Sequence, residues 1–362
     1  MEVRSLNLTN YRNLANLNLK FSPEGALIVG KNGIGKTNLL EAISYFAFGK
    51  SFQTTKDLEL INFSKAFFRL EADFIINNRS HFFEAASDKT KKIIKIDSSN
   101  IARISELYKY LKVIYFSPND TEIIAGSPFF RRIFIDQAIS QYSFDYIELL
   151  RNYKRILKQR NALFKTDYTS KEKRAWDEQF AKVGANIIEF RQKYLINFSP
   201  LLKNYYKEIS GDKENLSINY NYSFPNDSDD IISNLMDHLL HIEEQEKNQE
   251  RSLAGPHLDD IDIFIDTHST RNFSSQGQKR SIAIAMRLSQ TELIKEKDDD
   301  TPILMFDDVL AELDQMRTER IIKMLKGKHQ IFIATPNLTN YRSFGLPEID
   351  LQHELGNIIE TE

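Results

Sequence analysis

One eight-residue stretch near the start of the chain combines glycines, a lysine and a threonine at the spacing that phosphate binding requires. Residues 30–37, GKNGIGKT, fit G-x-x-x-x-G-K-[ST] and lie between an apolar strand-like run and a helix-like run. Glycines let successive backbone N–H groups turn toward phosphate oxygens at a helix N-terminus. Lys36 can reach the β- and γ-phosphates and the Thr37 hydroxyl can ligate Mg²⁺, so the pattern predicts an ATP site and not a plain glycine-rich turn. The predicted nucleotide contacts are Gly30, Lys31, Asn32, Gly33, Ile34, Gly35, Lys36, Thr37 and Asn38.

Two adjacent carboxylates end an apolar run late in the chain. Residues 303–306, ILMF, are typical of a buried strand, and Asp307 and Asp308 follow directly. A strand beside the phosphate-loop strand would bring its terminal acid to the metal. We therefore expect Asp307 to hold Mg²⁺ and Asp308 to orient or deprotonate the attacking water, with Lys36 as the third catalytic residue. At the second of these positions an aspartate has a side chain one methylene shorter than a glutamate, so we expect slow hydrolysis. The alternative is that Asp307 and Asp308 are a pair of acids that cap a helix.

A second phosphate-binding pattern precedes another helix. Residues 274–278, SSQGQ, place a serine and a glycine at the start of an apolar-periodic stretch. Exposed N–H groups and a hydroxyl at a helix start suit phosphate, although the serine taken alone is more simply a helix cap. One chain needs one phosphate cradle, so a second one indicates that the γ-phosphate is bound across a dimer.

The order of these elements narrows the class of protein. Phosphate loop, SSQGQ, acidic strand and residues 311–314 (AELD) follow one another as in the ATP-binding-cassette ATPases, which this chain resembles. SSQGQ stands where their LSGGQ signature lies, with Gln276 in place of a glycine, and AELD stands at their D-loop. No histidine follows the last strand-like run, so Thr335 is at best a substitute for the γ-phosphate-sensing histidine of transporters. The further nucleotide contacts that the resemblance implies are Ser275, Gly277, Gln278 and Asp314.

More than half of the chain separates Lys36 from Asp307, and this insert lacks the sustained heptads of the coiled-coil members of the class. With further motifs, the chain resembles the RecF family of bacterial recombination mediators. The resemblance adds Arg12 to the expected nucleotide contacts, whereas Gln53 and Leu258 stand where arginines are expected. The motifs are NYRN (10–13), GKNGIGKTNLLEAI (30–43), GKSFQT (49–54), FSP (116–118), G-x-P-x-x-RR-x-FID (126–136), KQRN (158–161), GPHLDD (255–260), SSQGQKR (274–280) and FDDVLAELD (306–314).

This resemblance implies both a fold and a function. The expected fold is α/β, an ABC-type P-loop ATPase head with a mixed sheet plus an inserted, mostly helical lobe and no long coiled coil. We expect residues 1–115 and 298–362 to form the ATPase lobe, and residues 116–297 to form the helical lobe that carries the signature motif. The implied function is recombinational repair: an ATP-dependent homodimer on duplex DNA or gap junctions, slow Mg²⁺-dependent hydrolysis for release, and help to RecO and RecR in loading RecA at single-strand gaps.

Hydrophobic periodicity predicts the elements that must position these residues. Alternation predicts strands within the first 30 residues and between residues 67 and 96. A helical pattern extends from Asp136 to about Tyr206, with an interruption at Pro200. A turn-rich stretch follows, as a loop or an edge hairpin. The remaining predictions are helices over 231–249, 275–297 and 315–325, strands over 261–265, 303–306 and 330–334, a turn at 297–300 and a polar tail.

Composition excludes several classes. The 362 residues carry 48 Lys and Arg against 51 Asp and Glu, a net charge of −3, so this is no uniformly basic coat for nucleic acid. The absence of cysteine excludes disulfides and thiolate metal sites and fits a reducing compartment. The chain starts without a signal-peptide pattern, and its apolar runs are too short to span a bilayer. We expect a cytoplasmic protein without a membrane partner.

A local basic stripe is the candidate DNA contact. Residues 151–165 hold six basic residues and no acidic one, and on a helix five of them share an arc of about 100°. Such a stripe can follow a phosphate backbone, although a solvated face is an equal alternative. Arg160 projects from the apolar side, so we expect it to pair with a carboxylate or another acceptor, in preference to the alternative of a DNA contact. His257 beside two aspartates lacks zinc spacing and is expected to be structural. The stripe comprises Arg151, Lys154, Arg155, Lys158 and Lys165.

Two other classes of function remain open. One is the nucleotide-binding subunit of an ABC transporter, or another ABC-type ATPase without a DNA role, which would use SSQGQ for the same chemistry. The long insert and the missing histidine disfavour the transporter. The other is a small-molecule kinase, which would leave SSQGQ and AELD without a function.

Overall fold

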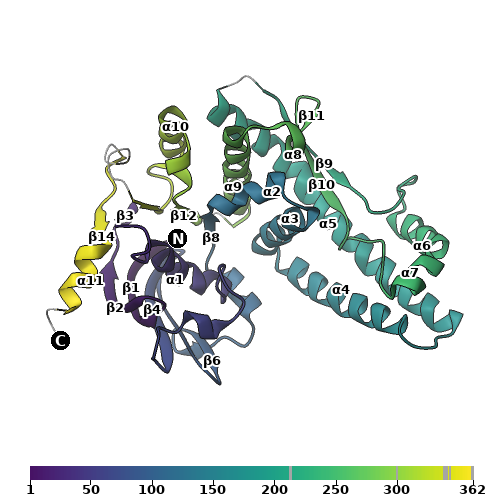
Figure 1. Cartoon of the computed structure of the whole chain (residues 1–362), viewed down its shortest axis with the longest axis horizontal. Coiled ribbons are helices and arrows are strands. Elements are labelled where there is room, and N and C mark those ends of the chain that lie inside the picture. The colour runs from purple at the N-terminus through teal and green to yellow at the C-terminus, as the bar shows by residue number, and fades with distance from the viewer. Residues whose placement is uncertain (212–213, 299–300, 337–340, 342–343, 360–362) are drawn as a thin grey trace. The chain divides into compact units, whose positions relative to one another are not determined.

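The computed structural model describes residues 1–211, 214–298, 301–336, 341 and 344–359. The chain folds as two compact units (Figure 1): Met1–Asp120 with Gln290–Glu362 form the first, and Thr121–Ser289 form the second. The first unit is therefore built from both ends of the chain. Among the described residues, no helix is both long and apolar enough to cross a membrane.

A parallel sheet carries the phosphate loop and the acidic strand in the first unit. Its order is β14-β3-β13-β12-β8, and every neighbouring pair is parallel. Strands buried on both faces are continuously apolar, which explains the runs ALIV, ILMF and IFIA. The strands are β3 (Gly25–Val29), β8 (Val113–Phe116), β12 (Ile303–Asp307), β13 (Ile331–Thr335) and β14 (Glu348–Asp350).

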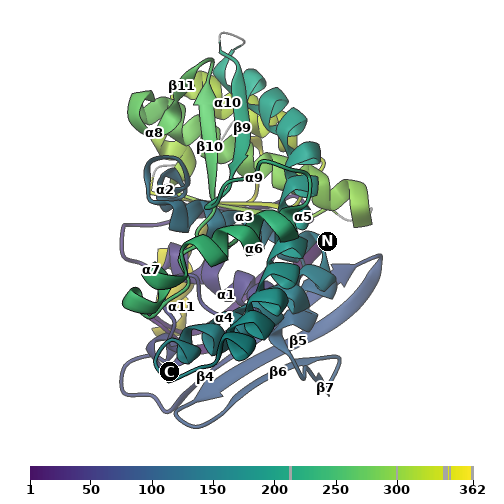
Figure 2. The same cartoon turned by 90° about the vertical axis from the view of Figure 1, so that its right-hand side faces the viewer.

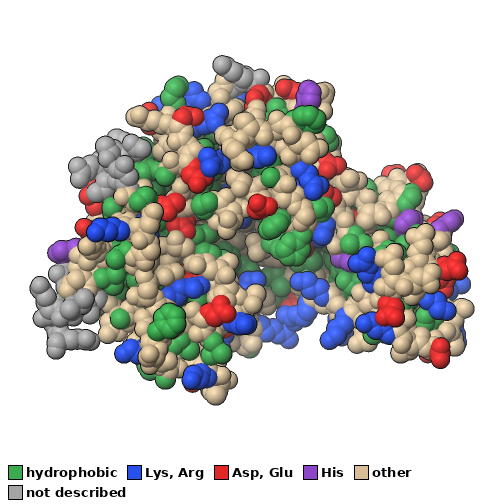
Figure 3. All heavy atoms as spheres, viewed as in Figure 1, with side chains coloured by type: hydrophobic (Ala, Val, Ile, Leu, Met, Phe, Trp, Pro, Cys, Tyr) green, Lys and Arg blue, Asp and Glu red, His purple; other side chains and the backbone are tan. Residues whose placement is uncertain are grey.

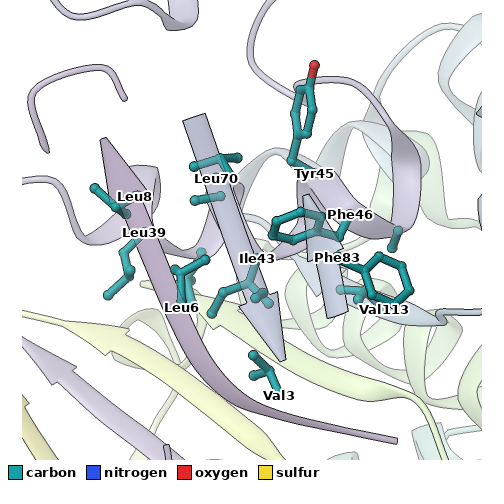
Figure 4. Packing of buried hydrophobic residues seen from close by; sticks show 14 of the residues in the cluster. Val3, Leu6, Leu8, Leu39, Ile43, Tyr45, Phe46, Leu70, Phe83 and Val113 are labelled. Carbon is teal, nitrogen blue, oxygen red and sulfur yellow. The ribbon is translucent and has the colours of Figure 1, made fainter. Parts of the chain in front are cut away.

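An antiparallel sheet forms the other layer of this unit, in the order β2-β1-β4-β5-β6-β7. Its long strands run side by side in Figure 2. Helix α1 (Lys36–Phe48) packs against both sheets, and side chains from β1, α1, β4 and β5 point toward one another in the core shown in Figure 4. The strands are β1 (Glu2–Tyr11), β2 (Leu14–Lys20), β4 (Phe67–Ile76), β5 (Arg79–Asp88), β6 (Lys92–Ile96) and β7 (Ser99–Asn100).

Short helical elements complete the first unit. The 3₁₀ helices are η1 (Asp57–Leu60), η2 (Ile104–Lys109), η3 (Pro118–Thr121, which ends at the unit boundary) and η4 (Val309–Glu312). The remaining α-helices are α10 (Gln315–Leu325) and α11 (Leu351–Ile359).

The second unit is mostly helical, with a small antiparallel sheet of order β11-β10-β9. Helices α4 and α5 lie side by side in both views (Figures 1 and 2). Its helices are α2 (Glu122–Ala125), α3 (Pro128–Tyr142), α4 (Phe144–Leu163), α5 (Ser170–Ser210), α6 (Ile231–His241), α7 (Glu243–Gln249), α8 (Thr270–Phe273) and α9 (Gln276–Asp298, which continues into the first unit). Its strands are β9 (Leu216–Asn221), β10 (Asp260–Ile265) and β11 (His268–Ser269).

Several predicted boundaries were wrong. Pro200 does not interrupt α5, because it lies on the exposed side of the helix, where water can serve the carbonyl that the proline leaves free. The helix predicted over 231–249 is two helices that meet at Ile242. The tail after residue 340 contains β14 and α11, and of the predicted turn at 297–300 residues 299 and 300 lie outside the described part of the chain.

Arg160 is buried completely in the second unit and joins three helices. Its Nε donates to Asp177 Oδ1 at 2.8 Å, and its two terminal nitrogens donate to the Glu246 oxygens at 2.9 and 2.6 Å. Nη1 also donates to Ser252 Oγ at 2.7 Å, and the guanidinium lies over the rings of Phe164 and Phe180. The predicted carboxylate pairing is confirmed.

We expect Arg160→Leu to lower the free energy of unfolding by about 3–5 kcal/mol, because it leaves Glu246 buried without its cation and Asp177 with Lys173 as its remaining cation. Denaturant titration of the full chain measures this loss. Lys158→Leu, which changes an exposed residue on the same helix, is the matched control and should shift stability by less than about 1 kcal/mol. Equal stabilities of the two variants would contradict this account.

Candidate nucleotide-binding site

The phosphate loop joins β3 to α1 through glycines with left-handed backbone. Gly35, the N-cap of α1, has φ +117°, and a Cβ added there would lie 2.8 Å from both Asn13 Oδ1 and Leu14 Cδ2. A side chain is therefore excluded by conformation and by space. A Cβ added at Gly33 would meet nothing within 4 Å, so that face of the loop is open. The loop is thus packed closely against Asn13 and Leu14 at Gly35 and is open at Gly33.

Two polar side chains hold the loop in shape. Lys36 is buried, and its Nζ donates to the carbonyls of Gly30 at 2.8 Å and Lys31 at 3.2 Å, so its ammonium curls back over the loop. Asn13, just after β1, donates from Nδ2 to the carbonyls of Gly33 and Ile34 at 3.1 and 3.0 Å. Its Oδ1 accepts from Asn38 Nδ2 at 2.8 Å. Asn13 therefore connects the phosphate loop to the first turn of α1.

The acidic strand meets the phosphate loop at one edge of the parallel sheet. In register, Asp307 lies beside Ala334 of β13, and Ala334 lies beside Ile28 of β3. Thr37 Oγ1 donates to Asp307 Oδ1 at 2.9 Å, which joins two motifs that are far apart in sequence. The structure therefore brings the two predicted metal-holding residues together.

Asp308 has the features of a group that awaits a ligand. Its backbone is left-handed, with φ +55°, and its buried Oδ1 has no hydrogen-bond partner among the residues that the structure describes. Burial raises the pKa of the Asp308 carboxyl above its ordinary value, although the charge of Lys36 opposes this shift. The helix-cap alternative fails for Asp308, because its side chain makes no capping hydrogen bond to η4. Thr37 and Asp307 provide oxygen donors of the kind that Mg²⁺ prefers, and the Asp308 oxygen beside them can accept a hydrogen bond from a water molecule.

Arg12 is held against α1 by a buried carboxylate. Glu41 is fully buried, and its oxygens accept from Arg12 Nε at 2.5 Å and Arg12 Nη2 at 3.0 Å. Glu41 also accepts from Tyr11 OH at 3.0 Å and from Ser51 Oγ at 2.5 Å. One carboxylate thereby connects three motifs of the resemblance: NYRN, the phosphate-loop helix and GKSFQT. Nearby, Gln53 Nε2 reaches Asn38 Oδ1 at 3.5 Å.

The signature segment lies in the second unit, at the start of α9. Ser275 is exposed, its Oγ accepts from the Gln278 backbone N–H at 3.3 Å, and its own N–H donates to Gln278 Oε1 at 2.7 Å. Gln278 Nε2 also donates to Glu214 Oε1 at 2.7 Å. Asp314 caps α10 by accepting from the Arg317 N–H at 2.9 Å. In this structure Ser275, Gln278 and Asp314 thus make helix-terminal hydrogen bonds.

The basic stripe of the second unit is exposed, as predicted for either a DNA contact or a solvated face. Arg151, Lys154, Arg155 and Lys158 are exposed on α4, along which Lys and Arg side chains lie in Figure 3. Arg151 pairs with Glu148 at 3.1 Å. Lys165 lies beyond the end of α4 at Leu163, so the helical geometry assumed for it was wrong, although it is exposed.

Charged residues of the motifs 126–136 and 255–260, with Arg191 of α5, form hydrogen bonds and ion pairs inside the second unit. Arg131 makes a bidentate pair with Asp260, at 2.7 and 2.8 Å, and Arg132 donates to the Asp259 carbonyl at 2.8 Å. Arg191 donates from Nη2 to Asp136 at 2.9 Å. These side chains hold α3, α5 and β10 together.

His257 belongs to this hydrogen-bonded interior. Its Nδ1 lies 2.7 Å from Tyr153 OH, and its Nε2 lies 3.4 Å from the Ser252 carbonyl. In the described part of the chain, no group of three or more His, Cys, Asp or Glu side chains could hold a metal ion. These contacts agree with the structural reading of His257.

Three residues with positions at the site received no role from the sequence: Asn13, Glu41 and Tyr115. Glu41 could have been found as an acid on an otherwise apolar helix, residues 39–48. Tyr115 OH donates to Asp307 Oδ2 at 2.5 Å, and a tyrosine within an apolar strand gives no local signal of this contact. Asn13 stands in a recognised motif, but its partners become visible only in the fold.

Comparison with known proteins agrees with this geometry. Residues 2–343 match the model of the family "RecF/RecN/SMC N terminal domain". The DNA replication and repair protein RecF of Clostridioides difficile is 33% identical, over 100% of this chain and 99% of that protein. The RecF of Heliobacterium modesticaldum is 32% identical over 93% of each chain.

Solved structures give the same result. A structure of the recombination mediator protein RecF-ATP in the RecFOR pathway matches with a TM-score of 0.86 and 31% identity, covering 93% of this chain and 92% of that one. The SmcHead bound to the C-winged helix domain of ScpA matches with a TM-score of 0.56 at 16% identity, covering 95% and 92%, which supports the fold alone. The predicted resemblance and fold class are confirmed.

The buried position of His257 predicts a pH dependence of stability. Burial is the main cause that lowers its pKa to about 4. The unfolded histidine, with a pKa of about 6.5, takes up a proton first as the pH falls, so stability is lost from pH 6.5 downward. We expect His257→Gln, which does not titrate, to lose about 1–2 kcal/mol less than the natural chain between pH 7 and pH 5. Denaturant titrations at both pH values measure this difference, and parallel losses would contradict it.

Proposed function

Because this chain belongs to the RecF family, we propose that it is an ATP-dependent DNA-binding protein of recombinational repair and a slow ATPase. The observation that carries the proposal is the hydrogen bond between Thr37 and Asp307, with the unpartnered Asp308 oxygen beside it. This arrangement provides a phosphate cradle, two metal-holding oxygens and one group able to accept a proton.

The proposed chemistry follows from the residues in place. The N–H groups of residues 30–36 bind phosphate oxygens, and Lys36 exchanges its two carbonyl partners for the β- and γ-phosphates. Thr37 and Asp307 would hold Mg²⁺, which when bound neutralises charge on those phosphates. Asp308 orients the attacking water and accepts its proton. Its short side chain keeps this step slow.

We propose further that ATP joins two copies of the chain. Ser275 and Gly277 of one copy would meet the γ-phosphate held by Lys36 of the other, with Gln278 and Asp314 adjoining. Support comes from the exposure of Ser275 at the start of α9, where the first N–H groups of the helix have no carbonyl partner within it and those of Ser275 and Gln278 bond to each other's side chains. ATP would thus act as a timing switch, since nucleotide binding makes the dimer and hydrolysis releases it.

The proposed nucleic-acid contact is the stripe on α4. Two joined copies would present two such stripes to duplex DNA, which reconciles DNA binding with a net charge of −3. The RecFOR pathway named for the neighbouring structure supports RecR and RecO as partners. Loading of RecA at single-strand gaps and a cytoplasmic location remain predictions from the resemblance.

Sedimentation with ATP and duplex DNA tests the dimer. The natural chain should sediment as a dimer only when ATP is present, and Lys36→Met should remain a monomer because it loses its phosphate contact. Ser275→Arg should still bind ATP and yet stay monomeric. Lys65→Met, which changes an exposed lysine outside the site, is the control. A dimer that forms without ATP, or that survives Lys36→Met, would contradict the proposal.

Salt dependence of DNA affinity tests the stripe. The triple variant Lys154→Gln, Arg155→Gln, Lys158→Gln should weaken binding and lower the slope of log affinity against log salt by about 2–3, because each phosphate contact contributes about one. The charge-matched control changes three exposed lysines of α5: Lys171→Gln, Lys182→Gln, Lys193→Gln. Equal slopes for the two triple variants would remove α4 from the DNA interface.

A further inference from the structure

Both oxygens of the Asp307 carboxylate carry a hydroxyl donor. Thr37 Oγ1 donates to Oδ1 at 2.9 Å, and Tyr115 OH donates to Oδ2 at 2.5 Å. The threonine belongs to the phosphate loop, whereas the tyrosine comes from β8, a strand without a nucleotide motif. The short distance to Tyr115 is typical of a hydroxyl that donates to a charged carboxylate.

The position of Tyr115 is fixed from two directions. β8 and β12 are parallel, with Tyr115 beside Met305, so the phenol extends along the strand direction to reach Asp307 two residues further on. Its ring lies against the ring of Phe52, with centroids 4.0 Å apart and planes at 31°. Phe52 belongs to the loop that follows α1. The hydroxyl is therefore held in place by a strand pairing and a ring contact.

The phenol acts as a donor and not as a ligand. A tyrosine hydroxyl, with an ordinary pKa of about 10, carries its proton at neutral pH and can donate it in a hydrogen bond to an ionised carboxylate. A carboxylate turns easily about its last bond, which has a broad torsional preference. A donor on Oδ2 removes this freedom and leaves Oδ1 facing Thr37.

We propose that Tyr115 is a positioning residue for the metal-holding pair: its hydroxyl fixes the Asp307 carboxylate so that Oδ1 and the Thr37 hydroxyl are aligned before Mg²⁺ and ATP bind. This inference rests on the proposed function, since it assigns Tyr115 to that same site. Groups that orient metal ligands from behind commonly change metal affinity or activity by 10–100-fold when removed. Tyr115 fits this role because its hydroxyl donates to the carboxylate from β8, a strand that carries none of the predicted nucleotide contacts.

Tyr115→Phe tests the proposal, because it removes the hydroxyl and keeps the ring that stacks on Phe52. We expect the Mg²⁺ concentration that half-saturates ATP hydrolysis to rise about tenfold or more. The Mg²⁺-dependent gain in affinity for a fluorescent ATP analogue, measured by anisotropy, should shift in parallel, while its binding in EDTA stays unchanged. Mn²⁺, which binds such sites more tightly than Mg²⁺, should restore most of the loss.

Tyr194→Phe is the matched control. Tyr194 is buried in the second unit, and its hydroxyl has no hydrogen-bond partner in the described part of the chain, so the variant removes the same group from a position without such a contact. Phe52→Leu is the second variant: it keeps the hydroxyl, loosens the ring contact, and should raise the Mg²⁺ requirement less than Tyr115→Phe.

The outcomes separate this inference from the proposed function. A natural chain that neither binds nor hydrolyses ATP would overturn both. If the natural chain is active and Tyr115→Phe has the same Mg²⁺ dependence as the natural chain, the role of Tyr115 is overturned and the proposed function is not. A loss in Tyr115→Phe that is equal in EDTA and in Mg²⁺, and that Mn²⁺ does not restore, would show a structural role and would also overturn it.

Discussion

The parallel register of β3, β13 and β12 is the constraint on which the nucleotide site depends. It places the carboxyl ends of β3 and β12, which come from the first and last thirds of the chain, at one sheet edge, where Thr37 meets Asp307. This register requires β3 and β13 to approach each other closely at Gly25. Gly25 begins β3 with φ +105°, and a Cβ there would lie 1.9 Å from the Ile331 carbonyl oxygen. Any side chain at this position would push β13 away and carry the acidic strand with it.

The sequence predicted those parts of the site whose chemistry is local. The phosphate loop and the pair Asp307 and Asp308 were found because a few adjacent residue types have a narrow set of uses. The supporting residues were not found, since their partners are chosen by strand pairing: Tyr115 contacts a carboxylate 192 positions away. For the same reason β14 was not predicted, because its three residues form a strand through pairing with β3.

In the second unit, most charged residues of the motifs that carry the RecF resemblance stabilise that unit. They are therefore not free to bind a ligand. Arg131 and Arg160 are buried with carboxylate partners, and Arg132 serves a backbone carbonyl. A motif rich in arginine therefore does not by itself mark a DNA contact. The exposed stripe on α4 differs from these residues in its access to solvent. That access, more than the number of positive charges, makes it the candidate interface.

The edge of the parallel sheet has a consequence for the behaviour of the chain in solution. β14 covers the edge of β3, which would otherwise present unpaired backbone groups next to the phosphate loop. Exposed, apolar edge strands recruit other chains and aggregate, and a very short covering strand is itself a poor template for such pairing. β14, with an acidic residue at each end, thus protects the apolar strand β3 from pairing with another chain. A shortened chain that ends before Glu348 would keep every nucleotide motif and lose this protection.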